Sequence, residues 1–213
     1  MRDRVTADPW PILPLPEAMV IIPVDAHFIT LTIPEYEFVT RQVQVGRTTQ
    51  QQRQRVERTR EVPTRRNESS LAVDLASVNQ IWSAANIDFR VRSSQVERIR
   101  APGDADVVDP NTFLFLAGQF PARNGVSLLL VNRFSSADLG GQAVEAQCVC
   151  ILGDAAPATS LAHEFGHLLH LDHEGDIRNL MNGGLSIPTP QLTASQIRTA
   201  QQSALARRFG STP

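Results

Sequence analysis

Four of the five histidines in this chain lie within eleven residues, in the stretch HEFGHLLHLDH that runs from His163 to His173. Its first five residues have the pattern His-Glu-x-x-His. On a helix, this spacing puts His163 and His167 one turn apart, with the carboxylate of Glu164 beside them. Two imidazoles and a neighbouring carboxylate can serve as ligands and general base of a hydrolytic zinc site. The pattern therefore predicts a catalytic zinc centre.

The apolar residues around the two histidines predict a helix with two different faces. At about 100° per residue, His163 and His167 lie about 40° apart on the helix surface. Four large apolar residues cluster on the opposite side: Leu161, Phe165, Leu168 and Leu169. Histidines that served only as core residues would lie on that apolar face. We therefore expect the histidines to face a cleft while the apolar face enters the core.

A catalytic zinc site uses three protein ligands and keeps a fourth position for water, so one more ligand is needed. A glutamate from a later helix is not available, because no Asp or Glu lies between Asp176 and Pro213. The third ligand is therefore expected close to the motif or upstream of it. The close candidates are His170, Asp172, His173, Glu174 and Asp176.

The stretch from His163 to His173, with the later Asn-Leu-Met-Asn sequence around Met181, resembles the metzincin clan of zinc peptidases. The clan pattern is H-E-x-x-H-x-x-G-x-x-H followed by a methionine turn. The resemblance implies that His163, His167 and His173 bind one zinc ion. It also implies that Glu164 is the general base and that Met181 lies beneath the metal.

The chain departs from the clan pattern at the glycine, because His170 stands there. In the clan the helix ends at this glycine, and histidine is among the non-glycine residues that tolerate a left-handed helix end. If the helix continued, His170 would lie beside His163 and His167 as a rival ligand. Three ligands on one straight helix would span about 10 Å, which suits tetrahedral zinc poorly. His173 is therefore the favoured ligand, and His170 is an alternative ligand or a neighbour of the ligands.

The resemblance implies a zinc-dependent endopeptidase, in which Glu164 takes a proton from a metal-activated water that attacks the peptide bond. Two alternatives stay open: a zinc-binding protein with little or no turnover, and a zinc hydrolase acting on a non-peptide amide. The implied fold is α+β, with a mixed, mostly parallel twisted sheet packed on two long helices. A small C-terminal subdomain, residues 174–213, is expected to end in a helix.

Composition and charge are consistent with one enzyme domain over residues 1–213. The chain is 42% hydrophobic and has a formal charge of −2, which shows no overall bias toward nucleic acid or anionic membranes. We therefore expect a peptide or protein substrate and no nucleic-acid partner. No apolar run reaches the roughly 20 residues that cross a bilayer. The clan resemblance favours secretion, although the first residues show no secretory signal.

Two segments differ in composition from the rest of the chain. Residues 1–23 are rich in proline and are expected to be an extended strap, which could also restrain activity. Residues 41–68 contain eight arginines, three glutamates and a glutamine cluster. Few of their positions are apolar, so we expect a solvated insertion or hairpin with a charge of about +5.

The remaining pattern predicts the elements that position the motif. Strands are expected at residues 24–33, 87–99 and 128–131, and helices at residues 69–85 and from Thr193 to about Phe209. Substrate is expected to border residues 139–144, with residues 182–192 as the pocket wall. Calcium is a further possible cofactor, held by Asp104, Asp106 and Asp109.

Overall fold

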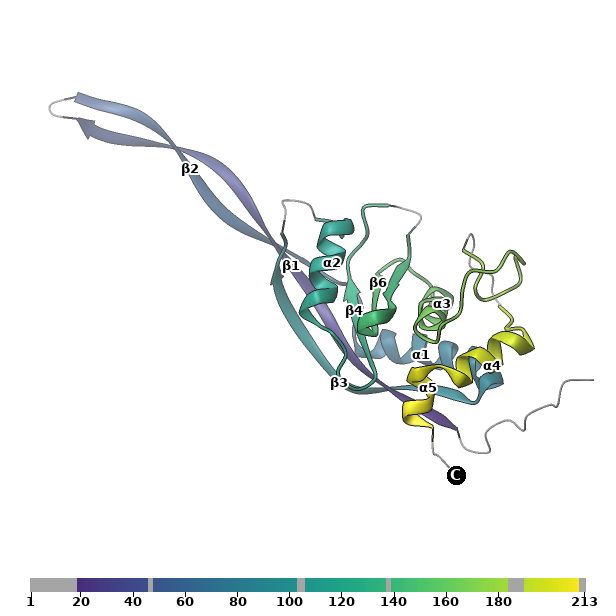
Figure 1. The fold of residues 1–213 in the computed structure, drawn as a ribbon. Helices are drawn as coiled ribbons and strands as arrows, with labels where there is room; N and C mark the ends of the chain where they lie inside the picture. The colour runs from purple at the N-terminus through teal and green to yellow at the C-terminus, as the bar shows by residue number, and fades with distance from the viewer. Residues whose placement is uncertain (1–18, 46–47, 103–105, 137–138, 184–189, 211–213) are drawn as a thin grey trace, which may run out of the picture.

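The computed structural model of the chain describes residues 19–45, 48–102, 106–136, 139–183 and 190–210 (Figure 1). These residues form a mixed sheet with helices on both of its faces. A two-stranded arm extends from the sheet away from the rest of the molecule (Figure 1). None of the described helices is long and apolar enough to cross a membrane.

The sheet contains six strands within the described residues, in the order β2-β1-β4-β6-β5, and β3 pairs with β1 off this path. The pairs β1–β3, β1–β4 and β4–β6 are parallel, whereas β1–β2 and β5–β6 are antiparallel. The strands are β1 (Val20–Val45), β2 (Thr48–Pro63), β3 (Ile87–Arg100), β4 (Val126–Val131), β5 (Gly141–Val144) and β6 (Val149–Gly153).

The buried residues that the structure describes form two clusters, one on each face of the sheet. Helices α1 and α3 contribute to the first cluster, and α2 contributes to the second. The helical elements are α1 (Glu68–Trp82), η1 (Ser83–Ala85), α2 (Pro110–Gln119), η2 (Glu145–Gln147), α3 (Ala158–Leu168), α4 (Ala194–Gln202) and α5 (Ala204–Phe209).

Strand β4 is buried on both faces, as expected for a strand in the middle of a mostly parallel sheet. Its successive side chains point to opposite faces. Leu128 and Leu130 join the cluster under α1 and α3, and Leu129 and Val131 join the cluster under α2. The predicted central strand at residues 128–131 is therefore confirmed.

Helix α1 begins at a capping box and packs against α3. The side chain of Asn67 accepts a hydrogen bond from the backbone nitrogen of Ser70 at 3.0 Å, which satisfies an amide at the helix start. At the other end, Trp82 is fully buried and its ring nitrogen donates to the carbonyl of Ala162 in α3 at 3.2 Å. This contact ties the two longest helices described to each other.

Strand β1 is much longer than the strand predicted at residues 24–33. Its pairing with β3 ends at Thr32 and Arg100, but its pairing with β2 continues from Thr30–Pro63 to Val45–Thr48. The Arg- and Gln-rich segment therefore forms most of a hairpin, and its last residue, Glu68, opens α1. Of the proline-rich segment, residues 1–18 lie outside the described residues, and Val20 to Pro23 begin β1.

The C-terminal helix predicted as one element is two helices, so this prediction was wrong in its length. The capping box that begins α4 is present, with Thr193 accepting from the backbone nitrogen of Gln196 at 3.2 Å. The helix breaks at Ser203, which has an extended backbone with ψ of 151°. The Ser203 side chain accepts from the nitrogen of Ala206 at 3.0 Å and thereby caps α5.

Candidate metal centre

Helix α3 has an apolar face and a histidine face on opposite sides, as predicted from the spacing of these residues on a helix. Leu161 and Phe165 are fully buried among residues of α1 and the sheet. Phe165 stacks on Phe89 of β3 with ring centroids 4.2 Å apart. His163 and His167 lie on the other side and line a cleft.

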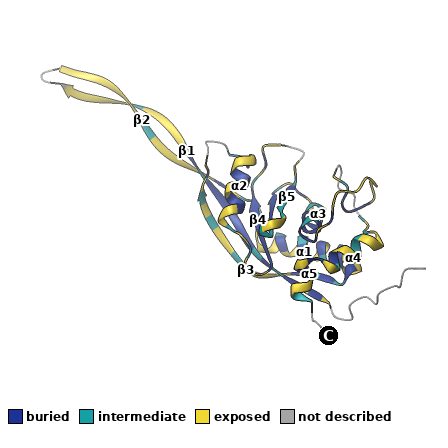
Figure 2. Cartoon of the chain, viewed as in Figure 1, coloured by how far each residue is buried: buried dark blue, intermediate teal, exposed yellow. Residues whose placement is uncertain are grey.

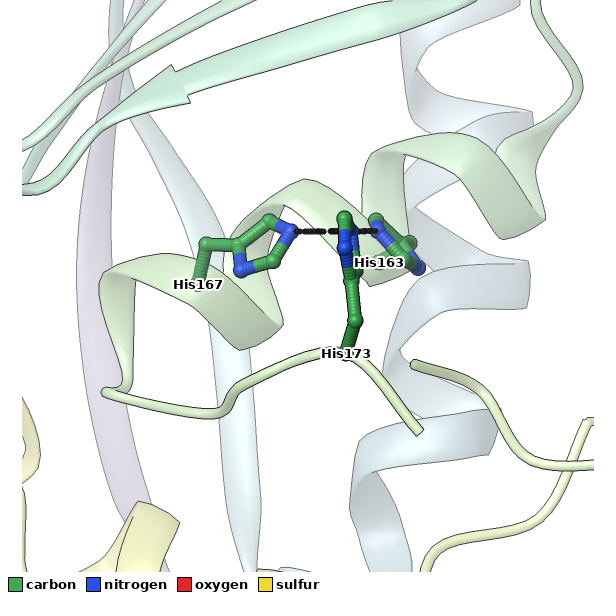
Figure 3. Close-up of side chains that lie close together, drawn as sticks. All are labelled: His163, His167 and His173. Carbon is green, nitrogen blue, oxygen red and sulfur yellow. Dashed lines mark hydrogen bonds between the residues drawn. The ribbon is translucent and has the colours of Figure 1, made fainter. Parts of the chain in front are cut away.

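Three histidines converge on one point at the surface of α3 (Figure 3). The Nε2 atoms of His163 and His167 are 3.1 Å apart. The Nε2 atom of His173 lies 3.3 Å from that of His163 and 3.2 Å from that of His167. His173 comes from the chain beyond the helix and approaches the other two rings from a different direction (Figure 3).

Two of these rings are oriented by backbone carbonyls. The Nδ1 atom of His163 lies 2.8 Å from the carbonyl oxygen of Leu180, and that of His167 lies 2.9 Å from the carbonyl oxygen of Leu171. A carbonyl can only accept, so each Nδ1 carries the proton and donates, which leaves a lone pair on each Nε2. Burial lowers the pKa of both histidines, which favours the neutral rings.

This donor set fits a zinc ion. A tetrahedral zinc with bonds of about 2.0–2.1 Å to nitrogen separates its ligands by about 3.3–3.4 Å, close to the separations found here. The Nε2 lone pairs of His163 and His167 face each other at 3.1 Å, an arrangement that a shared cation relieves. The hydrogen bonds from Nδ1 to carbonyls are the outer contacts that zinc-binding histidines commonly make.

His170 ends the helix and does not belong to this group of three. Its φ is 62°, in the left-handed region. The nitrogen of Leu171 donates to the carbonyl of Gly166 at 3.0 Å, and the nitrogen of His170 donates to that of His167 at 2.9 Å. These two bonds define a Schellman motif with His170 in the position usually taken by glycine. The His170 ring turns to Glu145, with Nδ1 3.3 Å from Oε2.

Glu164 lies beside the histidines with its side chain largely removed from water. Only 8% of the residue is exposed, and burial raises the pKa of its carboxyl to about 7. The side chain passes close to Gly141 at the start of β5. A Cβ atom at Gly141 would lie 2.8 Å from Cγ of Glu164. The absence of a side chain at this glycine thus makes room for the carboxylate arm.

Met181 is fully buried beneath the histidine-bearing helix. Its sulfur packs so closely against Gly166 that a Cβ atom there would collide with Sδ. The same Cβ would lie 3.6 Å from the ring of Trp82. The absence of a side chain at Gly166, the fourth residue of the His-Glu-x-x-His pattern, therefore leaves room for the Met181 sulfur.

A pair of side-chain amides fixes the turn that contains Met181. The Oδ1 atom of Asn179 accepts from the backbone nitrogen of Met181 at 2.8 Å. Asn179 and Gln196 also bond reciprocally: Nδ2 of Asn179 donates to Oε1 of Gln196 at 2.8 Å, and Nε2 of Gln196 donates to Oδ1 of Asn179 at 3.0 Å. Leu180, whose carbonyl orients His163, lies between Asn179 and Met181 in the chain.

The cleft above the histidines has a volume of about 490 Å³. Residues 139–143 line one side of it, in agreement with the predicted border of the cleft. On the other side, Asn182, Gly183 and Pro190 line it, and residues 184–189 of the predicted wall lie outside the described residues.

No family model and no curated protein matches this sequence. Among solved structures, the chain is similar to metalloproteinase-II from Bacteroides fragilis, with 14% identity and a TM-score of 0.52. The match covers 86% of this chain and 53% of that chain, so the chain spans about half the length of that protein. A second match is archaemetzincin from Methanopyrus kandleri, with 14% identity, 89% of this chain, 95% of that chain and a TM-score of 0.43.

The likeness is one of fold. It confirms the predicted fold class, a mixed twisted sheet packed against helices. Three positions of the site did not emerge from sequence reasoning: Gly166, Asn179 and the carbonyl of Leu180. The glycine carried a signal, because glycine inside a helix is unfavourable unless packing requires it. The other two depend on contacts between segments distant in the sequence.

The aspartates considered for calcium have other partners where they are described. Asp106 forms hydrogen bonds with the guanidinium group of Arg133, both at 3.1 Å. Asp109 caps α2 by accepting from the backbone nitrogen of Thr112 at 2.7 Å. Asp104 lies outside the described residues.

Proposed function

We propose that this protein is a zinc-dependent endopeptidase whose metal is bound by His163, His167 and His173. The observation that carries the proposal is the convergence of three Nε2 atoms within 3.3 Å of one another, two of them with lone pairs fixed by backbone carbonyls. The fold of metalloproteinase-II supports the same class of chemistry. The open cleft beside the histidines supports an extended substrate rather than a small enclosed one.

In this proposal Glu164 is the group that moves the proton. A zinc ion at this site supplies a Lewis acid, which lowers the pKa of a bound water and polarises a carbonyl group. The carboxylate of Glu164 takes a proton from the attacking water and later delivers it to the leaving amine. Its burial next to the histidines keeps bulk water from competing for that proton.

The edge of the sheet offers a way to hold a peptide beside these groups. Strand β5 pairs with β6 on one side, and its residues line the cleft. An extended peptide can add to such an edge by main-chain hydrogen bonds. Gly141 and Gln142 would then hold the substrate backbone close to Glu164.

The test is hydrolysis of quenched peptides and casein by the zinc-loaded chain, with and without a chelator. Hydrolysis should stop with chelator and return with zinc. Glu164→Gln should keep the metal and lower the rate about 10²- to 10⁴-fold, the usual share of a general base. Glu145→Gln, the same change on the same cleft, is the matched control and should stay near wild type. Full activity in Glu164→Gln would disprove the mechanism.

The same measurements separate the two alternatives. One bound zinc per chain with no hydrolysis of any peptide would indicate a zinc-binding protein without turnover. Chelator-sensitive hydrolysis of small acyl amides, but not of peptides, would indicate a hydrolase for a non-peptide amide. Zinc content therefore has to be measured together with activity on both classes of substrate.

A further inference from the structure

The arm formed by β1 and β2 is the largest feature that the proposed function does not use. Beyond the pair Ile33–Arg60 the described residues of the two strands pair with each other alone, as far as Val45–Thr48. Nearly all side chains of this stretch are exposed (Figure 2). A two-stranded ribbon has no second layer to cover it. Both of its faces are therefore open to a partner.

Charge is distributed unevenly along the arm. The ion pairs within the arm lie at its end nearest the rest of the molecule, which is called the body here. They join Glu35 with Arg60 at 2.5 Å and Glu37 with Arg58 at 2.8 Å. Farther out, residues 38–56 contain four arginines and no Asp or Glu. This distal segment contributes +4 to a total of −2, so the rest of the chain carries −6. The small net charge of the chain is therefore the sum of a basic segment, residues 38–56, and an acidic remainder.

One face of the distal arm combines arginine, aromatic and amide side chains. The guanidinium carbon of Arg55 lies 3.5 Å from the centre of the Tyr36 ring, and that of Arg53 lies 4.3 Å from the centre of the Phe38 ring. Directly opposed residues of an antiparallel pair share a face, and Phe38 opposes Arg55. The register puts Tyr36, Phe38, Thr40, Gln42, Gln51, Arg53 and Arg55 on one face, called the basic face here. The end of this face nearest the rest of the sheet also carries Glu57, which is opposite Tyr36 and forms an ion pair with Arg100.

We propose that the basic face of the arm docks into the major groove of duplex DNA. A two-stranded ribbon has the width that this groove admits, and arginine and glutamine can pair with guanine and adenine edges there. Arg41 lies on the opposite face, and in the proposed complex its long side chain would contact the phosphates that flank the groove. The major groove of duplex RNA is too narrow for such a ribbon. The proposal does not depend on the peptidase function.

An acidic protein fits this face less well. Protein interfaces have cores depleted of charge and built on apolar anchors, whereas DNA interfaces are more polar and more positive. Tyr36 and Phe38 are 43% and 56% exposed, but each has an arginine stacked over its ring. The rings therefore present guanidinium groups, not bare apolar surface, to a partner.

The test is fluorescence anisotropy of a labelled duplex of about 20 base pairs, titrated with the full chain at several salt concentrations. Binding should weaken as the salt concentration rises, because each phosphate that an arginine neutralises contributes about −0.9 to the slope of log affinity against log salt. The double variant Arg53→Gln with Arg55→Gln should lose at least about tenfold in affinity at low salt. Arg41→Gln should lose less and lower the slope by about 1.

A control changes the same charge elsewhere on the surface. Arg90→Gln with Arg133→Gln removes two exposed arginines of the body, each paired with an aspartate, and should bind DNA like the wild type. Equal losses in the control and the arm variant would overturn the proposal, as would no binding at 50 mM salt. Tighter binding to polyglutamate than to DNA would assign the arm to an acidic protein instead. Preference for single-stranded DNA would reject the groove geometry.

Discussion

His170 holds a left-handed backbone, with φ of 62°, at the end of the helix that bears the other histidines. A side chain in this conformation costs about 1–2 kcal/mol relative to glycine. The contact from its ring to Glu145 joins two half-exposed groups and offsets little of that cost. The Schellman hydrogen bonds use backbone atoms alone, so another residue can replace His170 without losing them.

We predict that His170→Gly keeps zinc and activity and raises the free energy of unfolding by up to about 1 kcal/mol. His173→Ala should remove a ligand and abolish tight zinc binding. Zinc stoichiometry and thermal unfolding of both variants, with His170→Ala as the control that lacks the ring but keeps a Cβ, check this. Loss of zinc in His170→Gly with retention in His173→Ala would reverse the ligand assignment.

At this scale the spacing of the histidines carried most of the information about the site. The left-handed turn at His170 and the approach of His173 followed from the resemblance and from helix geometry, and both are present. The partners of the rings could not be read from the sequence. A backbone carbonyl such as that of Leu180 leaves no trace in residue identity, and its contact spans 17 positions.

Helix α3 and the turn around Met181 pack closely at Gly166, where glycine leaves room for the Met181 sulfur. We predict that Gly166→Ala lowers the free energy of unfolding by about 1–3 kcal/mol, because the added methyl group collides with the Met181 sulfur. Zinc affinity should fall as well, since the turn also carries the carbonyl that orients His163. Denaturant unfolding and zinc titration measure the two effects.

A second substitution tests the cause of that loss. Met181→Ala removes the sulfur that the new methyl group would meet, so the double variant should lose less stability than the sum of the single variants. Additive losses would mean that the methyl group acts elsewhere, for instance on the Trp82 ring 3.6 Å away.

The amide pair links α4 to the same turn. We predict that Gln196→Ala lowers zinc affinity although Gln196 does not touch the metal site, because Asn179 loses both of its bonds to that amide. Thr193→Ala breaks the other half of the same capping box and should leave zinc affinity unchanged. Competition with a zinc indicator dye compares the two variants. Equal zinc affinities in the two variants would show that Gln196 acts only as a helix cap.

Element prediction succeeded where periodic burial was strong and failed where it was interrupted. The helix that became α1 and the buried strand β4 show continuous patterns, and both were found. The helix expected from Thr193 onward contains no glycine or proline before Phe209, so its break at Ser203 had no signal except a serine. Serine both continues helices and caps them, and contacts with the rest of the fold decide between the two.

At the scale of the whole molecule, the fold class followed from the sequence through the resemblance. The arm that extends from the sheet was not predicted as a pair of long strands. The alternation of Val24 to Ile33 predicted a strand inside the body. The same strand continues to Val45, and most of the residues described beyond Ile33 are exposed. Polar strands without a buried face lack the pattern that identifies strands, so the segment resembled a solvated insertion.

The arm should be separable from the rest of the molecule. Ile33 and Val62 are the outermost residues of the arm that reach the core, being 1% and 8% exposed. Pro34 and Thr59 oppose each other in register, so a two-residue Asn-Gly turn between them replaces residues 35–58 with an ordinary hairpin. The ion pairs of Glu57 with Arg100 and of Glu35 with Arg60 are lost, but exposed pairs contribute little.

We predict that this shortened chain unfolds within a few degrees of the wild type, binds one zinc ion and hydrolyses small peptides at the same rate, because no cluster residue has been removed. It should bind duplex DNA no better than the variant that lacks Arg53 and Arg55. Thermal unfolding, zinc content, peptide hydrolysis and DNA anisotropy on one preparation provide the comparison. A large fall in stability would show that the arm supports the sheet itself. Unchanged DNA binding would place the basic contact surface on the body.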